Sequence, residues 1–332
     1  MTLPTEMTLI EITTPGGPEV LKPRQEPVPS PGPGEILIRV HAAGVNRPDA
    51  LQRAGKYPMK PGMSPFPGLE VAGEVAALGE GVSDYAIGDK VCALTNGGGY
   101  AQFCAVPAGQ ALPIPAGMEW VHAAAIPETF FTVWANLFGI GGAHKGQRVL
   151  IHGGTSGIGT TALMLCRELG IEAFATAGSE EKCAAIRALG AEAINYREQD
   201  FAEVIAQKTD GQGVNVILDI MGGSYLNNNL KALAMDGRLV MLGFLGGARA
   251  NDVDLLTILG KRAIVTGSLL RARTRDEKAA IATQLREHVW PLLSAGRCLP
   301  MIDQVFGYTE ADQAHARMEG GDHIGKIVLR VI

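Results

Sequence analysis

The chain has 332 residues, of which 46% are hydrophobic and 19% are charged, and its formal net charge at pH 7 is −5. This length exceeds what one hydrophobic core usually organises, so we expect a globular protein of two domains. The acidic balance, without a basic stripe, argues against a nucleic-acid binder and against a general membrane binder.

The start of the sequence and the cysteines indicate the compartment. Residues 1–11 carry acidic side chains and no basic flank, so this segment does not resemble a secretory signal. Reduced thiols are the simplest account of the cysteines, which are scattered and odd in number. We therefore expect a cytoplasmic protein. The cysteines are Cys92, Cys104, Cys166, Cys183 and Cys298.

The first part of the chain is predicted to be rich in β-strands. Residues 36–40 follow a loop of prolines and glycines at 27–34, and residues 71–75 and 90–94 are further short apolar runs. Helices are expected only from about residue 121. The most apolar stretch, 121–142, also contains proline, glutamate and asparagine, so it fits a buried helix beneath a cofactor better than a membrane span.

The segment 149–159 carries the clearest functional signal. Apolar residues at 149–151 predict a strand, which runs into a glycine-rich turn and then into a predicted helix at 160–169. Unpaired N–H groups and the dipole at a helix start favour a phosphate group, and glycine lets a pyrophosphate approach the backbone. A tight turn without a ligand is the alternative. Strand, turn and helix in this order favour a nucleotide-binding site at Thr155, Ser156, Gly157, Ile158 and Gly159.

From residue 147 onward, strands and helices alternate. Helices are predicted at 180–189 and 201–209, between apolar runs that are typical of strands buried on both faces. This alternation predicts βαβ units and a doubly wound parallel sheet, an α/β fold. The predicted strands are 148–152, 172–176, 193–195, 214–219, 238–243 and 262–267.

The end of the chain is expected to rejoin the first domain. A polar helix is predicted at 276–290 and a strand at 327–331. The expected organisation is therefore a discontinuous domain of residues 1–127 and 273–332, with a dinucleotide-binding domain of residues 128–272 between its two parts.

Several short strings of this sequence match those of a known family: 31–35, 46–49, 52–57, 67–73, 123–128, 151–159, 195–196 and 324–328. In this order they make the chain resemble the zinc-free quinone oxidoreductase (zeta-crystallin) branch of the medium-chain dehydrogenase/reductase superfamily. The resemblance implies a GroES-like β-barrel domain, a Rossmann domain and an active site in the cleft between them. It also implies homodimers joined through the edge strand near 262–267; an edge strand is a place where such pairing can occur.

The resemblance also implies which residues choose the cofactor. Gly178, Ser179, Lys182 and Tyr196 would surround the 2′-phosphate of NADPH, whereas relatives that bind NAD place a carboxylate at the end of this strand. The alternative is that Lys182 is a solvated helix charge, and the neighbouring glutamates weigh against NADPH. Residues that follow the later strands fit a dinucleotide lying across strand ends. The predicted cofactor set is completed by Gly223, Gly243, Phe244, Leu245, Ser268, Leu269, Leu270 and Lys326.

Asn46, Tyr57 and Thr132 are the predicted catalytic residues. In the family, the equivalents of Asn46 and Tyr57 line the cleft, and the threonine approaches the nicotinamide carboxamide. Alternatively, these three residues are a turn residue, a surface aromatic and a helix cap. No metal is predicted, because this chain has Leu69-Glu70 where zinc-dependent relatives have His-Glu, and its cysteines are not clustered.

The predicted activity is NADPH-dependent reduction of a quinone, by hydride or single-electron transfer, with the chemistry supplied by the cofactor. Reduction of an activated double bond, as in enones or enoyl thioesters, is an alternative, and so is a non-catalytic, crystallin-like NADPH-binding protein. The short-chain dehydrogenase family is rejected, because no tyrosine has a lysine four positions later. The expected partners are therefore a small quinone or enone and a second copy of the chain.

Overall fold

The computed structural model describes residues 3–332, which form two compact units. The first unit contains the chain up to Phe131 together with Arg273–Ile332, and the second unit is Thr132–Ala272. Within the described residues, no helix is both long enough and apolar enough to cross a membrane.

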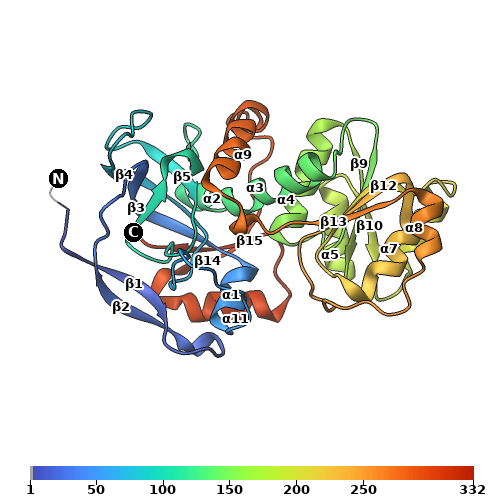
Figure 1. The fold of residues 1–332 in the computed structure, drawn as a ribbon, viewed down its shortest axis with the longest axis horizontal. Coiled ribbons are helices and arrows are strands. Elements are labelled where there is room, and N and C mark those ends of the chain that lie inside the picture. Colours follow the sequence, from blue (N-terminus) through green and yellow to red (C-terminus); the bar gives the residue numbers. More distant parts are fainter. Residues whose placement is uncertain (1–2) are drawn as a thin grey trace. The chain divides into compact units, whose positions relative to one another are not determined.

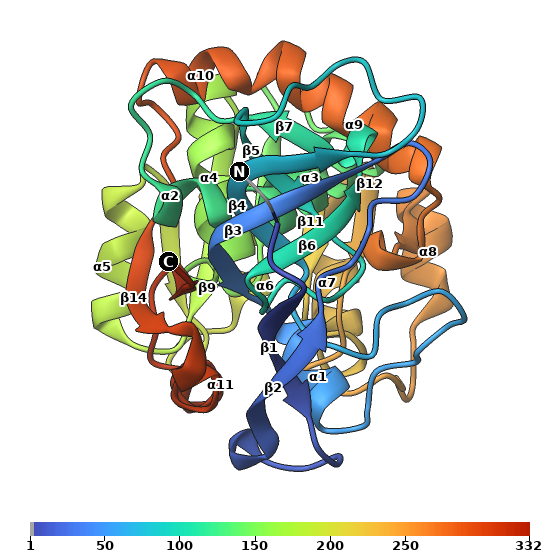
Figure 2. The same ribbon diagram turned by 90° about the vertical axis from the view of Figure 1, so that its left-hand side faces the viewer.

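The first unit is built on β-structure (Figure 1), in which all strand pairs are antiparallel except that of β14 with β15. A two-stranded sheet of β1 (Glu6–Ile12) and β2 (Leu21–Pro27) extends from the larger sheet, as Figure 2 shows. The larger sheet runs in the order β14-β15-β3-β4-β5-β7, and β6 pairs with β3. Its strands are β3 (Glu35–Val45), β4 (Glu70–Leu78), β5 (Lys90–Leu94), β6 (Phe103–Pro107), β7 (Ala111–Pro113), β14 (Ile302–Gly307) and β15 (Lys326–Arg330).

The strands predicted at 36–40, 71–75 and 90–94 are confirmed as parts of β3, β4 and β5. Apolar residues of these strands pack with those of β15 in one buried cluster. β15 pairs antiparallel with β3, so Ile327 lies opposite Val45. This pairing places the residues that follow β3 beside the residues that begin β15.

Helices of the first unit lie around this sheet (Figure 2). One of them, α1, was not predicted from the sequence; it is a short helix whose first turn contains a proline. The predicted helix at 276–290 is present as α9, followed by the separate short helix α10. The helices are α1 (Arg47–Arg53), α2 (Trp120–Ala124), α3 (Pro127–Val133, whose last two residues belong to the second unit), α9 (Arg275–His288), α10 (Trp290–Ser294) and α11 (Ala311–Gly320), with short 3₁₀ turns at Pro18–Val20, Ala108–Gln110 and Tyr308–Glu310.

The second unit is a six-stranded, all-parallel sheet in the order β10-β9-β8-β11-β12-β13. Numbered along the unit, this order is 3-2-1-4-5-6, the doubly wound arrangement of dinucleotide-binding domains. The predicted fold class is therefore confirmed. The strands are β8 (Arg148–Ile151), β9 (Glu172–Ala177), β10 (Glu192–Asn195), β11 (Val214–Asp219), β12 (Leu233–Met241) and β13 (Ile264–Gly267).

The helices of the second unit alternate with its strands, and their apolar residues complete the core. Side chains of α6 and α7, such as Phe201 and Leu230, pack on Leu150 and Ile217 of the sheet. The helices are α4 (Gly157–Leu169), α5 (Glu180–Ala188), α6 (Phe201–Lys208), α7 (Leu226–Ala232) and α8 (Leu255–Lys261), with 3₁₀ turns at Gly223–Tyr225 and Leu270–Ala272.

Several predicted boundaries are wrong, including that of the strand expected at 238–243, which is β12 (Leu233–Met241). The helix expected at 160–169 begins at Gly157, inside the glycine-rich string, because Ser156 caps it. The apolar stretch 121–142 is not one helix: α2 and α3 are separate, and a π-helix follows at Trp134–Ile140. The sixth strand begins at Ile264 rather than at residue 262, because Arg262 has a left-handed backbone conformation and ends α8.

Candidate functional site

The glycine-rich turn joins β8 to α4. The Ser156 hydroxyl accepts a hydrogen bond from the Gly159 backbone N–H (3.0 Å) and donates one to the Gly153 carbonyl (2.8 Å), which closes the turn. This arrangement brings Thr155 to Gly159 together at the start of α4, where the remaining backbone N–H groups and the helix dipole favour a phosphate.

The structure gives some of these glycines a second role. A Cβ atom at Gly159 would lie 2.3 Å from the carbonyl oxygen of Gly153, and one at Gly154 would lie 2.6 Å from the Cβ of Ala175. Glycine is therefore required for the turn to pack against itself and against β9, and not only for a ligand to approach. The turn fits the pyrophosphate of a dinucleotide, because this packing keeps the helix start free of side chains at these positions.

His152 follows β8 and connects the turn to its neighbours. The side chain is buried, and its ring nitrogens hydrogen-bond the Thr176 hydroxyl (3.1 Å) and the Asn229 side-chain oxygen (2.7 Å). Thr176 in turn accepts a hydrogen bond from the Gly153 N–H (3.3 Å). Burial lowers the pKa of His152 to about 4, so the ring is neutral at pH 7. His152 is therefore a buried, hydrogen-bonded residue of the core.

A polar group lies at the carboxyl end of β9. Gly178 faces the ring of Tyr196: a Cβ atom there would lie 2.6 Å from the Tyr196 hydroxyl and 3.3 Å from the Nε atom of Arg197. Ser179 caps α5 by accepting a hydrogen bond from the Lys182 N–H (3.4 Å). The structure therefore brings Gly178 and Tyr196 together, with Ser179 next in the chain.

Arg197 is a further candidate residue of this group that was not predicted from the sequence. It directly follows Tyr196, and the signal that could have found it is a second cation after the third strand. Glu180, which weighed against a phosphate here, forms an ion pair with Arg187 along α5. The Glu180 carboxylate is thus paired with Arg187 on the helix. The residues at this end of β9 that could contact an anionic ligand are the hydroxyls of Ser179 and Tyr196 and the cations of Lys182 and Arg197.

The other predicted cofactor residues of the second unit follow β11, β12 and β13. Because the carboxyl ends of parallel strands meet at one edge of a sheet, these segments lie along the same edge as the turn. Phe244, Leu245 and Leu269 are exposed, whereas the side chain of Leu270 is buried. Ser268 donates a hydrogen bond to the Asn136 side-chain oxygen (2.7 Å). Gly223 begins the 3₁₀ turn after β11, and Gly243 follows β12.

In the first unit, Asn46 and Lys326 lie in one buried cluster with Glu70. The Lys326 ammonium donates to the Asn46 side-chain oxygen (2.6 Å) and to the Val45 carbonyl (3.0 Å), and it forms an ion pair with Glu70 Oε1 (2.6 Å). The Asn46 amide N–H donates to the same Glu70 oxygen (2.9 Å). All three N–H donors of Lys326 are thus matched within the first unit. The structure places Lys326 with a predicted catalytic residue rather than with the predicted cofactor residues.

Asn46 also precedes α1 and begins a chain of buried polar groups. Its backbone N–H donates to Asp49 Oδ2 (3.0 Å), which also accepts a hydrogen bond from the Tyr100 hydroxyl (3.2 Å). The Tyr100 oxygen lies 3.2 Å from His315 Nε2, and Arg53 donates to His315 Nδ1 (3.3 Å). Since an arginine can only donate, Nδ1 accepts and Nε2 carries the proton.

In this series of buried polar groups, His315 and Tyr100 stay neutral and the charge of Arg53 is paired with a carboxylate. Burial and the Arg53 charge lower the pKa of His315 to about 3, which keeps the ring neutral. Burial and the Asp49 carboxylate raise the pKa of Tyr100 well above its usual value. Arg53 pairs with Glu319 (2.6 Å), whose side chain reaches solvent. The network therefore holds the start of α1, and with it Asn46, in one place.

Tyr57 and Thr132 belong to other segments of the chain. Tyr57 is a partly exposed residue of the loop after α1, and its backbone N–H donates to the Leu51 carbonyl (3.1 Å). Thr132 belongs to α3, and its carbonyl accepts a hydrogen bond from the Asn136 amide (2.8 Å). Asn46 and Tyr57 belong to the first unit and Thr132 to the second.

The residues around Asn46 do not suit a zinc ion. Within residues 3–332, no group of three or more His, Cys, Asp and Glu side chains is arranged to hold a metal. The Lys326 ammonium already provides the positive charge between Asn46 and Glu70, and Leu69 supplies no donor atom. A zinc ion would need such donors in a tetrahedral set.

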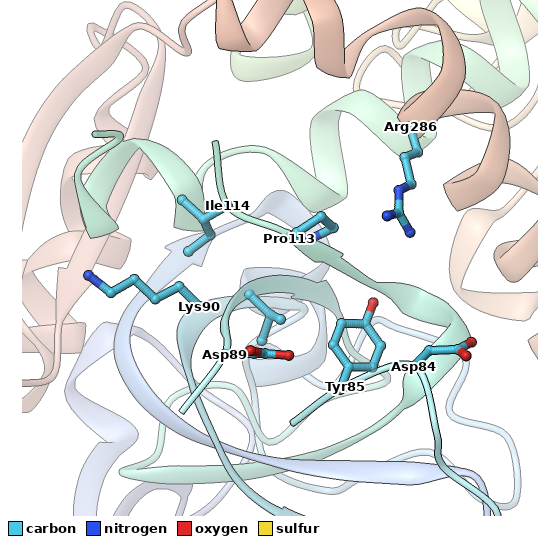
Figure 3. Close-up of a pocket in the computed structure, with 8 residues that line it drawn as sticks. Asp84, Tyr85, Asp89, Lys90, Pro113, Ile114 and Arg286 are labelled. Atoms are coloured by element: carbon cyan, nitrogen blue, oxygen red, sulfur yellow. The ribbon is translucent and has the colours of Figure 1, made fainter. Parts of the chain in front are cut away.

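A separate cavity of about 300 Å³ lies in the first unit, at the surface between β5, β7 and α9 (Figure 3). Its lining contains none of the predicted site residues. Tyr85 donates a hydrogen bond to the Ala111 carbonyl (2.6 Å), and burial raises its pKa to about 12. The lining residues are Asp84, Tyr85, Asp89, Lys90, Val91, Pro113, Ile114 and Arg286.

Comparison with known proteins places both parts of the chain. Residues 32–116 match the family model of the alcohol dehydrogenase GroES-like domain, and residues 157–285 match that of the zinc-binding dehydrogenases. The chain is 32% identical to a quinone oxidoreductase of Rattus norvegicus over 327 residues, which is 97% of each protein. It is 33% identical to a quinone oxidoreductase of Sus scrofa over 93% of each.

Two solved structures add to these similarities. A mycobacterial protein in complex with NADPH has 29% sequence identity and a TM-score of 0.87, covering 98% of this chain and all of that one. The CurK enoyl reductase has 27% identity and a TM-score of 0.85, covering 98% of this chain and 99% of that one. These likenesses confirm the predicted combination of a GroES-like and a Rossmann fold.

Proposed function

Because the chain belongs to the medium-chain dehydrogenase/reductase superfamily, in its quinone oxidoreductase branch, we propose that this oxidoreductase reduces quinones with NADPH. The observation that carries the cofactor choice is the polar group at the end of β9. Ser179 and Tyr196 offer hydroxyls and Lys182 and Arg197 offer cations. β9 ends in Thr176 and Ala177 and is followed by Gly178, so no carboxylate lies at the end of this strand.

This group suits a 2′-phosphate better than a ribose diol. A phosphate gains charge-assisted hydrogen bonds from lysine and arginine, whereas a diol needs an acidic acceptor. The pyrophosphate would rest on the N–H groups at the start of α4, around Gly157 and Ile158. When bound, NADPH supplies a hydride equivalent; the protein binds it, orients it and excludes water.

In the first unit, Asn46 would orient the acceptor and Tyr57 would line its binding site. The Asn46 amide is held from both sides, by the Lys326 ammonium and by the Glu70 carboxylate, which fixes its orientation. Thr132 would contact the nicotinamide carboxamide. Because the donors around Asn46 suit an internal ammonium and not zinc, we propose that the reaction proceeds without a metal.

A direct test follows NADPH oxidation with a panel of ortho-quinones, para-quinones and enones, repeated with NADH. We expect turnover with quinones and a lower KM for NADPH than for NADH. The metal content of the purified active enzyme is measured in parallel. Stoichiometric zinc whose removal abolishes turnover would refute the metal-free proposal.

Reduction of an activated double bond is the second candidate. It is favoured by the likeness to the CurK enoyl reductase and by 33% identity to a phthioceranic/hydroxyphthioceranic acid synthase of Mycobacterium tuberculosis, of which this chain covers 15%. Turnover of enones or enoyl thioesters, with none of quinones, would establish it. Saturable NADPH binding without turnover of any acceptor would instead indicate a non-catalytic binding protein.

We also propose that two copies pair through β13. This strand ends the sheet, and Leu255, Leu256 and Leu259 of the adjacent α8 are 66%, 73% and 73% exposed. Edge pairing of β13 with its copy would continue the sheet and cover this apolar surface. Sedimentation of the wild type should give a dimer and Val265→Lys a monomer, while Ile87→Lys, at an exposed residue of the first unit, should remain dimeric. The cysteines of the described residues are buried and form no disulfide, so we propose that the protein acts in the reducing cytoplasm.

A further inference from the structure

We propose that the carboxyl group of Glu128 is the acid that donates a proton to the reduced acceptor. This inference rests on the proposed reductase function. The reaction needs a proton donor, and no residue has been assigned to that role above. Glu128 was not among the predicted catalytic residues. Its position beside the buried cluster of Asn46, Glu70 and Lys326 points to this role.

Glu128 is linked to Asn46 through Glu70. It is the second residue of α3, and its backbone N–H donates to Glu70 Oε2 (2.8 Å). The other oxygen of the same carboxylate, Oε1, accepts from the Asn46 amide (2.9 Å) and pairs with Lys326 (2.6 Å). One carboxylate therefore positions both the start of α3 and the predicted acceptor-binding residue.

The position of Glu128 along α3 also relates it to Thr132. The two residues are four positions apart, so their side chains lie on the same face of the helix, one turn from each other. Thr132 is the residue proposed to contact the nicotinamide carboxamide. An acid on this face is suitably placed for a substrate that reacts with the nicotinamide ring.

The charges around Glu128 favour its neutral form. The carboxylates of Glu70 on β4 and Asp49 on α1 oppose its ionisation, and the ammonium groups of Lys326 on β15 and Lys278 on α9 favour it. Lys326 is already paired with Glu70, and Lys278 donates to the Asn96 side chain (2.6 Å).

Burial is the largest influence, and the net result raises the pKa of Glu128 to about 8. At pH 7 most Glu128 side chains therefore carry a proton that they can donate. The residue is half-buried, so part of its surface is still exposed.

The proton balance of the reaction is then complete. The acceptor takes two electrons and one proton from NADPH as a hydride equivalent, and NADP⁺ is formed. The O–H bond of Glu128 breaks as an O–H bond forms at the acceptor oxyanion or, for an enone, a C–H bond forms at the enolate carbon. The Glu128 carboxylate then takes a proton from water. An oxyanion that is already stable needs this proton less, so a basic enolate should depend on Glu128 most.

The test compares the wild type with Glu128→Gln and uses Glu119→Gln as a control, because Glu119 is an exposed glutamate before α2. Infrared titration of the ligand-free proteins should show a protonated carboxyl band that disappears near pH 8 in the wild type and in Glu119→Gln. Glu128→Gln should lack this band. A spectrum in which Glu128→Gln retains the band would overturn the proposal.

Kinetics provides the second readout. The wild-type kcat should fall as pH rises through about 8, where the acid loses its proton, and Glu128→Gln should be slower by about 10²-fold with enones and less with quinones, without that pH dependence. Glu128→Asp should recover part of the rate and the pH dependence, and it serves as the test variant if Glu128→Gln does not fold. An unchanged pH profile in Glu128→Gln, at wild-type NADPH affinity, would overturn the role of Glu128 but not the reductase function. No turnover by the wild type with any acceptor would overturn both.

Discussion

The two candidate binding regions are built in opposite ways. In the second unit, the turn between β8 and α4 consists of backbone groups and small side chains that are neighbours in the sequence. In the first unit, the cluster around Asn46 joins the charged side chains of Glu70 on β4 and Lys326 on β15 to the neutral amide that precedes α1, and these residues lie far apart in the sequence. The first arrangement derives its function from main-chain geometry, and the second from compensated buried charge.

The difference has energetic consequences. A glycine turn fails when a side chain is added, because its atoms have no room to move. A buried charge cluster fails when one partner is removed, because the remaining charge loses its compensation. Four predictions test this contrast, and they are ordered from the largest expected effect to the smallest.

Removal of the Lys326 charge should have the largest effect. Lys326→Met leaves the Glu70 carboxylate buried without its cation, so we expect the free energy of unfolding to fall by about 3–5 kcal/mol. Lys208→Met removes an exposed ion pair with Glu192 and should cost less than about 1 kcal/mol. Denaturant unfolding measures both. Adding Glu70→Gln to Lys326→Met should restore part of the loss; if it adds a further loss, charge compensation is not what the pair provides.

Acid should destabilise the protein through the buried histidines. His152 has a pKa of about 4 in the folded protein against an ordinary value of 6.5, so the unfolded chain binds more protons between these values. Stability should therefore be lost as pH falls from 6.5 to 4, by up to about 3 kcal/mol from His152. His152→Gln should show a smaller loss over this range, whereas the exposed His144→Gln should behave like the wild type. Unfolding in urea at pH 7 and at pH 4.5 measures the difference.

A methyl group in the turn should weaken both folding and cofactor binding. Gly159→Ala places a Cβ atom 2.3 Å from the Gly153 carbonyl, so we expect a loss of about 1–3 kcal/mol in stability and a weaker affinity for NADPH. Gly260→Ala in α8 meets no atom within 4 Å and should be neutral or slightly stabilising. Thermal unfolding and fluorescence titration with NADPH measure the two effects. Unchanged affinity in Gly159→Ala would contradict the role of this turn.

The 2′-phosphate contacts should have the smallest effect and the greatest selectivity. Lys182→Ala and Arg197→Ala each remove one surface cation, so each should raise the KM for NADPH about fivefold, which corresponds to about 1 kcal/mol. The KM for NADH should hardly change. Arg187→Ala, which removes a cation paired with Glu180, is the matched control. Equal changes for both dinucleotides would refute the assignment of this group.

The same contrast explains what the sequence could predict. The order of strands and helices in the second unit, and the turn between β8 and α4, depend on residues close in the sequence, so periodicity and glycine spacing were sufficient. The predicted start of α4 was wrong because Ser156 caps that helix. The predicted start of β13 was wrong because Arg262 has a left-handed backbone conformation and ends α8.

The charge cluster could not be predicted in this way. The contact of Lys326 with Asn46 and Glu70 depends on the pairing of β15 with β3 and of β3 with β4, which no local pattern reveals. Glu128 was visible only as one polar residue in an apolar stretch. Its raised pKa comes first from burial and then from the carboxylates of Glu70 on β4 and Asp49 on α1, which tertiary packing brings near it. The roles of Tyr57 and Thr132 remain predictions that rest on the family resemblance.

The position of β15 has a consequence for biosynthesis. This strand lies between β14 and β3 in the sheet, yet it is translated after the whole second unit. While the ribosome is still translating residues 273–325, the Glu70 carboxylate lacks the Lys326 cation and β3 lacks its pairing with β15. The second unit can therefore mature first during translation, and the nascent first unit must stay incomplete until Lys326 emerges.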